Sequence, residues 1–388
     1  MNLTFQTAKK IIFGAGCIRD IGTEAASLGK NAFLITGKTF LRRTGWLDKV
    51  LKLLAESKIK VNIFEHVPPE PTISNAQWAL DSFKQSTSDI VIGIGGGSAL
   101  DVAKTVAVIG RQPGTIYEYF HGREVEQKGT PFIAIPTTAG SGSEVTPNSV
   151  LIDETERIKA SIRTPLMLPD VAIVDPEFTL SLSKESTAYS GMDALSQAIE
   201  AYVSKGANPI TDALAKSAAV RLLTNLPKAY HNGTDIEART EVALGSLMGG
   251  IAFANARLGL VHGLAHPIGV ITGLAHGLIC ALLLPFVMRF NLETSTIKYA
   301  ELARAAGISS NSDDNKAAEA LINHLERLNS EMDIEKQLTK LVLDRHYWPQ
   351  IISQTLASGS AKSNPRQATA ESVEQILETI SSHNLSPS

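Results

Sequence analysis

Three of the nine histidines lie between residues 255 and 280, in a segment that is otherwise apolar and rich in glycine. His262 and His266 are four residues apart, so both rings can lie on one face of a helix. A proline and two glycines separate them from His276, which predicts that the chain leaves the helix and that His276 returns on a second element. One such residue alone is more often a hydrogen-bonded core histidine. Three together favour a shared divalent metal with a nearby carboxylate.

The elements that must position these histidines fall into two classes along the chain. From residue 183 onward the sequence is rich in Ala and Leu at helical spacing, as in 211–223 and 237–254, with no convincing strand pattern. The first half alternates helical patterns with short aliphatic runs, at 32–36, 61–64, 89–94, 131–135 and 171–174. Such runs are typical of strands buried on both faces of a parallel sheet. We therefore predict an α/β domain with a mostly parallel sheet over residues 1–182 and an all-helical domain over 183–388, with surface loops at 309–315 and 358–364.

Two glycine-containing turns follow predicted strands of the first domain. Three glycines at 95–97 precede Ser98, where a helix begins, so backbone amides and the helix dipole can meet a diphosphate. A triple glycine alone is equally a tight turn, and it is not the usual Gly-x-Gly-x-x-Gly pattern. A second turn at 136–144 offers four hydroxyl groups beside two glycines. Two such turns at the ends of parallel strands predict a dinucleotide site.

Composition narrows the class of protein. The chain has 388 residues and a formal net charge of −3, which gives no electrostatic case for binding nucleic acid or an anionic membrane surface. Only two cysteines, Cys17 and Cys280, are present, so a disulfide framework is not expected. We therefore expect the protein to work in the reducing cytoplasm. No signal peptide or membrane-spanning run is predicted.

Several motifs together resemble one known family, the iron-containing (group III) alcohol dehydrogenases. They occur in the family's order over roughly residues 10 to 380, and they are GGGSALDVAK (95–104), PTTAGSGSE (136–144), LPDVAIVDP (168–176), GMDAL (191–195) and the histidine segment (255–280). The resemblance implies an N-terminal α/β dinucleotide domain, a C-terminal helical domain, and metal and substrate in the cleft between them. A homodimer is expected.

The resemblance also implies roles for individual residues. Asp193, His262 and His276 match metal ligands, and His266 matches the catalytic histidine near the nicotinamide and the substrate. The implied cofactor contacts are Gly95, Gly96, Gly97, Ser98, Asp101, Thr137, Thr138 and Lys159, and the implied substrate contacts are Asn148 and Phe253.

These residue types suit hydride transfer between a small primary alcohol and NAD or NADP. A divalent metal, Fe²⁺ first and Zn²⁺ as the alternative, lowers the pKa of the alcohol oxygen, and hydride leaves the carbinol carbon for the nicotinamide. Neutral His266 is suited to carry the proton because the ordinary pKa of histidine lies near 6.5.

The sequence departs from the family pattern at the fourth metal ligand. The family places a histidine four residues after the aspartate, whereas this chain has Gln197. A glutamine carbonyl is a weaker ligand for iron or zinc than imidazole. Gln197 therefore either contacts the metal or is replaced there by water.

Two further departures concern specificity. Gly37 stands at the end of a predicted strand where NAD-dependent relatives commonly have an aspartate that would repel a 2′-phosphate, so its absence admits NADP. Lys38, Arg42 and Arg43 follow closely and could meet that phosphate or simply face solvent. Arg257 stands where relatives have a small residue. It either forms a boundary ion pair or, buried beside Phe253, binds an anionic aldehyde.

Three alternatives stay open at this stage. A metal-independent reductase of the maleylacetate reductase kind would need loss of the metal, which the three retained ligands oppose. A lyase of the dehydroquinate synthase kind would need a dense set of Lys and Arg, and only Arg257 lies near the histidines. A catalytically silent homologue would need Gln197 to abolish metal binding.

Overall fold

A computed structural model describes residues 3–341 and 343–383. The chain divides into two compact units, one of residues Phe5–Leu182 and one that starts at Ser183 and also includes Leu3 and Thr4. The division falls where the composition changes from alternating aliphatic runs to Ala- and Leu-rich segments. Each unit is described separately below.

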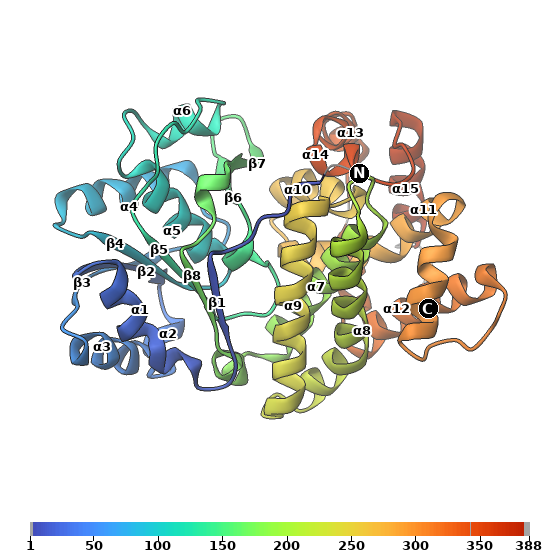
Figure 1. The fold of residues 1–388 in the computed structure, drawn as a ribbon. Helices are drawn as coiled ribbons and strands as arrows, with labels where there is room; N and C mark the ends of the chain where they lie inside the picture. The colour runs from blue at the N-terminus through green and yellow to red at the C-terminus, as the bar shows by residue number, and fades with distance from the viewer. Residues whose placement is uncertain (1–2, 342, 384–388) are drawn as a thin grey trace. The chain divides into compact units, whose positions relative to one another are not determined.

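The first unit is built on a six-stranded sheet in the order β1-β8-β5-β4-β2-β3 (Figure 1). All neighbouring strands pair in parallel. The strands are β1 (Lys10–Phe13), β2 (Asn31–Gly37), β3 (Lys60–Val67), β4 (Ile90–Gly95), β5 (Phe132–Pro136) and β8 (Val171–Val174). The predicted parallel α/β fold is thus confirmed.

Alternating side chains of the strands bury the two faces of this sheet. Phe33 and Ile35 pack in one core with helices α4 (Ile73–Gln85) and α5 (Gly97–Ile109), and Leu34 packs in another with α1 (Ile21–Leu28) and α3 (Trp46–Glu56). Because successive side chains of a strand point to opposite faces, a strand covered on both sides must be apolar at every position. This requirement explains the unbroken aliphatic runs.

The sequence patterns did not reveal three strands. One is the edge strand β1, and the other two form the antiparallel pair β6 (Asn148–Asp153) and β7 (Ile158–Arg163). Strand β7 has the sequence Ile-Lys-Ala-Ser-Ile-Arg and is mostly accessible to solvent, so it lacks the aliphatic run that marked the central strands.

The second unit consists of helices, and no strand occurs in its described residues (Figure 1). The predicted helical segments lie inside α8 and α9. The main helices are α7 (Lys184–Val203), α8 (Pro209–His231), α9 (Ile236–Ala256), α10 (Leu260–Thr272), α11 (His276–Ala305), α12 (Asp314–Glu331), α13 (Trp348–Ala357), α14 (Gly359–Lys362) and α15 (Ala370–His383). Several starts are capped as their sequences suggest. For example, the Asn208 side chain accepts from the backbone amides of Ile210 and Thr211, with Pro209 in the first turn.

The prediction of a surface loop at 358–364 was wrong. Residues Gly359–Lys362 form the short helix α14, and Asn364 is fully buried. The Asn364 side chain accepts from the backbone amide of Leu260 at 3.1 Å and donates to Asn291 Oδ1 at 2.7 Å. A polar residue is stable in this interior because its hydrogen bonds are satisfied. It holds the first residue of α10, the helix that carries His262.

Helix α11 corrects the expectation that no apolar segment reaches membrane-spanning length. Among the described residues it is the one single helix that is long and apolar enough to cross a membrane, with a stretch of mean hydropathy 1.4, and α9 and α10 reach that length only as a pair bent by 100°. Of that stretch of α11, 61% is buried inside the structure. The buried core helix of a folded domain can be as long and apolar, and α11 packs against α7 and α12. We therefore treat α11 as a core helix.

Candidate metal and nucleotide sites

One face of α7 carries three polar residues that are all buried, Asp193, Gln197 and Glu200. Their spacing of four and then three residues places them on consecutive turns of the same face. Most of the remaining residues of this part of α7 are apolar and pack in the core. Buried polar groups in an apolar helix need partners, and the next two helices supply them.

Helices α10 and α11 bring the three histidines together, as their spacing suggested. The ring centroids of His262 and His276 are 5.4 Å apart, and those of His266 and His276 are also 5.4 Å apart. The helix continues through Pro267 and ends only at Gly273, whose φ of 68° is the left-handed conformation favoured by glycine.

Gly277 allows the start of α11 to lie directly on α7. A Cβ atom at this position would stand 2.2 Å from the Tyr189 carbonyl oxygen and 3.4 Å from Asp193 Cβ. Only a residue without a side chain permits so close an approach of two helices. This contact sets the distance between His276 and Asp193.

Four potential metal ligands converge in this unit: Asp193, His262, His276 and Cys280, with ligand atoms all within 4.8 Å of one another. Asp193 Oδ1 lies 3.2 Å from His262 Nε2 and 3.9 Å from His276 Nε2. The sulfur of Cys280 lies 3.6 Å from His276 Nε2 and 3.9 Å from His262 Nε2. Cys280 was missed by the sequence reasoning, which considered cysteines only as disulfide partners.

Glu200 was missed as well, and it orients His262. Its carboxylate accepts from His262 Nδ1 at 2.5 Å and from the backbone amide of Val261 at 2.7 Å. A proton on Nδ1 leaves Nε2 free as the acceptor atom, which is the one that faces Asp193. Carboxylate–histidine pairs of this kind fix the tautomer and ring orientation of metal-binding histidines.

The site is electrostatically suited to a cation. Burial lowers the pKa of His262, but the interactions with Cys280 and Glu200 and the hydrogen bond to Asp193 outweigh it and hold the pKa well above its ordinary value. Burial also raises the pKa of the Cys280 thiol to about 11. These neighbours therefore favour a positive charge at this point, which protonated His262 supplies when no metal is bound.

Gln197 adds a further sign that the site is made for a ligand. Its side chain is 3% exposed, and its Oε1 atom has no hydrogen-bond partner among the described residues. A buried carbonyl oxygen without a partner is costly, and a metal or a metal-bound water would satisfy it. The carboxylate, imidazole and carbonyl groups of this site fit a divalent transition metal.

In the first unit, the two glycine turns lie side by side at the ends of β4 and β5. The strands pair with Gly95 opposite Pro136, and the amide of Thr137 donates to the Gly95 carbonyl at 2.9 Å. A Cβ atom on Gly97 would stand 2.9 Å from the Ser141 side chain, and one on Gly96 would stand 3.5 Å from Thr138 Oγ1. Ser98 lies in the first turn of α5, and diphosphate binding by these turns stays a prediction.

Asp101 and Lys159, predicted as cofactor contacts, are both engaged with protein groups. Asp101 accepts from Ser143 Oγ at 2.6 Å and from the Val150 amide at 3.0 Å. Lys159 forms an ion pair with Glu70. The Asp101 carboxylate thus ties α5 to the second turn and to β6, and cofactor contact by either residue stays a prediction.

Gly37 ends β2, next to β4 in the sheet, with Thr36 opposite Ile94. From β2 the chain moves toward β3, and from β4 it moves the other way toward β5. Such reversals create the crevice where dinucleotides bind in open α/β sheets. Lys38, Arg42 and Arg43 are all exposed, and Arg42 pairs with Glu65 at 2.7 Å.

The predicted substrate residues occupy different settings. Asn148 is buried at the start of β6, and its Oδ1 atom has no partner among the described residues. Phe253 is buried in α9. Arg257 follows α9 with a φ of 73° and is exposed, so the buried guanidinium required for strong anion binding is not found. The positive φ lets the chain turn, and α9 and α10 meet at 100°.

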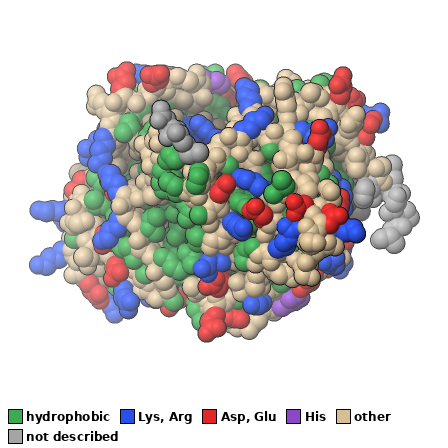
Figure 2. All heavy atoms as spheres, turned by 45° about the vertical axis from the view of Figure 1, so that its right-hand side comes forward, with side chains coloured by type: hydrophobic (Ala, Val, Ile, Leu, Met, Phe, Trp, Pro, Cys, Tyr) green, Lys and Arg blue, Asp and Glu red, His purple; other side chains and the backbone are tan. Residues whose placement is uncertain are grey.

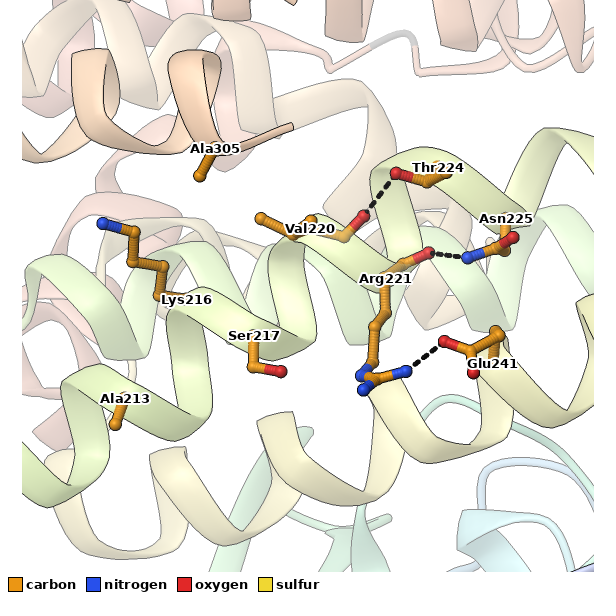
Figure 3. Close-up of a pocket in the computed structure, with 9 residues that line it drawn as sticks. All are labelled: Ala213, Lys216, Ser217, Val220, Arg221, Thr224, Asn225, Glu241 and Ala305. Atoms are coloured by element: carbon orange, nitrogen blue, oxygen red, sulfur yellow. Dashed lines mark hydrogen bonds and ion pairs between the residues drawn. The ribbon is translucent and has the colours of Figure 1, made fainter. Parts of the chain in front are cut away.

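The helical unit also has a surface hollow of about 570 Å³, lined mainly by α8 (Figure 3). Its polar side chains largely pair with protein groups. Arg221 forms an ion pair with Glu241, and Asn225 donates to the Arg221 carbonyl at 3.0 Å (Figure 3). On the face drawn in Figure 2, charges of both signs are intermixed, in line with a net charge of −3. Neither feature points to a different function.

The first unit has a parallel sheet with two adjoining glycine turns, and the second unit has a cluster of carboxylate and histidine side chains. Together these features are typical of a metal- and nucleotide-dependent oxidoreductase. The pattern of the iron-containing alcohol dehydrogenases matches residues 8–176, and that of the family's C-terminal region matches residues 187–381. The chain belongs to this family, and it is an NAD(P)-linked, metal-dependent alcohol dehydrogenase.

Similar proteins of known activity include the NAD-dependent methanol dehydrogenase of Bacillus methanolicus, which is 37% identical over 94% of this chain and 96% of that protein. The NADPH-dependent butanol dehydrogenase of Clostridium saccharobutylicum is 33% identical over 97% of this chain and 98% of that protein. The crystal structure of a 1,3-propanediol oxidoreductase superposes with a TM-score of 0.94 at 35% identity, covering 98% of this chain and all of that one.

Proposed function

We propose that the chain interconverts short primary alcohols and their aldehydes at a metal held by Asp193, His262 and His276. The convergence of these three side chains on one buried point carries the proposal. The chemistry named for the similar proteins, on methanol and on butanol, supports a short primary alcohol as the substrate class.

A divalent ion at this point would polarise the substrate oxygen and lower its pKa, and the nicotinamide would accept the hydride. The protein groups prepare the site for both. Glu200 keeps the Nε2 lone pair of His262 directed at the cluster. His266, partly exposed and beside His276, carries the proton between substrate and solvent. Gln197 contributes its carbonyl oxygen directly or through water.

For the cofactor, the proposal is that NADP is accepted and preferred. Gly37 leaves the end of β2 without a carboxylate that would repel a 2′-phosphate. The nearby exposed charges of Lys38 and Arg43 would attract that phosphate, whereas Arg42 already pairs with Glu65. One similar protein is named as NADPH-dependent and another as NAD-dependent, so the family uses both.

The decisive experiment follows NADPH and NADH absorbance with a panel of short aldehydes and alcohols. Activity should vanish after chelation and return when Fe²⁺ or Zn²⁺ is added back. Full activity of metal-free protein would instead support the maleylacetate reductase kind of chemistry. Turnover with NADH but none with NADPH would refute the cofactor proposal alone.

Arg257 is tested by comparing neutral and anionic aldehydes of equal length in the unaltered protein and in Arg257→Ala. An anion preference that disappears in the variant would assign substrate binding to this side chain. Because Arg257 is exposed in the structure, we expect at most a small preference.

The assembly and location of the protein are proposals as well. We expect a cytoplasmic homodimer. Light scattering of the purified protein, and fractionation of the cells that make it, would test the two statements.

A further inference from the structure

Cys280 lies one helical turn after His276 on α11, and it is fully buried. It therefore repeats, on a third helix, the spacing of four residues that relates Asp193 to Gln197 and His262 to His266. The sulfur lies close to both imidazole Nε2 atoms, at 3.6 Å from His276 and 3.9 Å from His262.

These separations match those of ligands that share one tetrahedral metal. Bond lengths of about 2.0–2.1 Å for nitrogen or oxygen and about 2.3 Å for sulfur, at tetrahedral angles, place two N/O ligands about 3.3 Å apart. The same values place sulfur and nitrogen about 3.6 Å apart. The observed Asp193–His262 and Cys280–His276 distances are 3.2 and 3.6 Å. The other two distances, Asp193–His276 and Cys280–His262, are both 3.9 Å and require only small movements.

We propose that the Cys280 thiolate is the fourth protein ligand of the metal, in the role that the family's histidine plays at the position of Gln197. The thiol proton passes to solvent when the cation binds, because the thiolate is the form that coordinates. Gln197 then acts through water rather than as a direct ligand, and the substrate oxygen would occupy a fifth position on the metal. This inference rests on the metal-dependent function proposed above.

The donor set has consequences for the choice of metal. One carboxylate, two imidazoles and one thiolate balance the two positive charges of the ion. Sulfur is a soft ligand that favours zinc or cobalt over hard, oxygen-seeking ions such as Mg²⁺. Relative to an all-N/O site, the thiolate should shift the preference from Fe²⁺ toward Zn²⁺.

The chain provides its own matched control. Cys17 is the only other cysteine, is also buried, and belongs to the first unit, where its sulfur lies 3.5 Å from the Val174 carbonyl oxygen. The test loads metal-free protein with one equivalent of Co²⁺ and records its absorption. A thiolate-to-cobalt charge-transfer band in the near ultraviolet is expected in the unaltered protein and in Cys17→Ser. In Cys280→Ser it should be lost, while the weaker visible bands of bound cobalt remain. Zinc affinity should fall at least tenfold in Cys280→Ser, about 1.4 kcal/mol.

A second measurement needs no variant at position 280. X-ray absorption of the zinc-loaded Cys17→Ser protein should show one sulfur neighbour at about 2.3 Å. Bound metal without a sulfur neighbour, together with full dehydrogenase activity, would overturn the role of Cys280 and leave the proposed function intact. A protein that binds neither cobalt nor zinc, and is active without them, would overturn both.

Discussion

The hydrogen bond between Glu200 and His262 allows a sharp prediction for Glu200→Gln, which keeps the size of the side chain and removes its charge. The carboxylate serves two donors at once, His262 Nδ1 at 2.5 Å and the Val261 amide at 2.7 Å. A glutamine has only one acceptor oxygen. If that oxygen accepts from Val261, the amide group of glutamine points its own N–H groups at Nδ1.

The imidazole can then accept at Nδ1 only by moving its proton to Nε2, the atom that faces Asp193 and Cys280. Nε2 with a proton cannot bind a metal. Loss of such an orienting carboxylate typically weakens metal affinity by about tenfold to a hundredfold, which corresponds to about 1.4–2.7 kcal/mol. We expect the effect at the upper end of that range, because Glu200 is 3% exposed and water cannot easily replace it.

The assay is a competitive Zn²⁺ titration of Glu200→Gln at neutral pH, with thermal unfolding of the metal-free protein recorded alongside. Glu301→Gln is the control, since Glu301 lies on α11 but pairs with Tyr202 and Lys216, outside the cluster. It should leave zinc affinity unchanged. Unchanged affinity in Glu200→Gln, with a folded variant, would refute the argument that this carboxylate selects the His262 tautomer.

Four further predictions follow from the two sites. Removal of a ligand by His276→Ala should abolish metal binding and activity together, measured by metal analysis and NAD(P)H absorbance. Gly277→Ala places a Cβ atom 2.2 Å from the Tyr189 carbonyl oxygen and should cost at least about 1–3 kcal/mol of stability, measured by denaturant unfolding. Gly37→Asp, for which there is steric room, should shift the ratio of kcat/KM values toward NAD by more than tenfold, about 1.4 kcal/mol. Burial raises the pKa of Glu144 from 4.5 to about 7. The folded protein therefore loses stability as the pH rises from about 4.5 through 7 and this buried carboxyl group ionises. Glu144→Gln removes that loss and should raise Tm more at about pH 8 than at about pH 5.

Two of these predictions have a matched comparison variant, and the other two have a result that would contradict them. Gly269→Ala adds a Cβ atom in ordinary contact, 3.5 Å from Ile279, and should cost less than Gly277→Ala. Gly37→Asn lacks the charge of aspartate and should shift cofactor preference less. Equal gains in Tm for Glu144→Gln at both pH values would show that burial does not perturb this carboxyl group, and metal retained by His276→Ala would remove His276 from the ligand set.

The sheet was predictable because its central strands are buried on both faces and therefore carry unbroken aliphatic runs. The edge strand β1 and strand β7 lack that signature, since part of each is accessible and polar residues are tolerated there. Strand β6 lacks it because it is short and includes the buried polar residues Asn148, Ser149 and Asp153. The short helix α14 was mistaken for a loop because Ser and Asn are common in loops. In this case Asn364 forms buried hydrogen bonds that no local pattern reveals.

The metal cluster was only partly predictable for a similar reason. The spacing rule that linked His262 to His266 also links His276 to Cys280, so Cys280 could have been found by applying it to cysteine. Glu200 could have been found as the residue seven positions after Asp193 on the same face of α7. That Arg257 is exposed depends on the sharp turn between α9 and α10, which tertiary packing determines.

The cluster joins α7, α10 and α11, although Asp193 and His262 are 69 positions apart in the chain. A metal that binds all of its ligands at once therefore acts as a reversible cross-link between distant parts of the chain. Because the complete ligand set exists only in the folded protein, its binding stabilises the folded state alone. Because binding to the native state alone shifts the folding equilibrium in proportion to free metal, the supply of metal in the cell should govern how long each copy survives proteolysis, besides how fast it turns over.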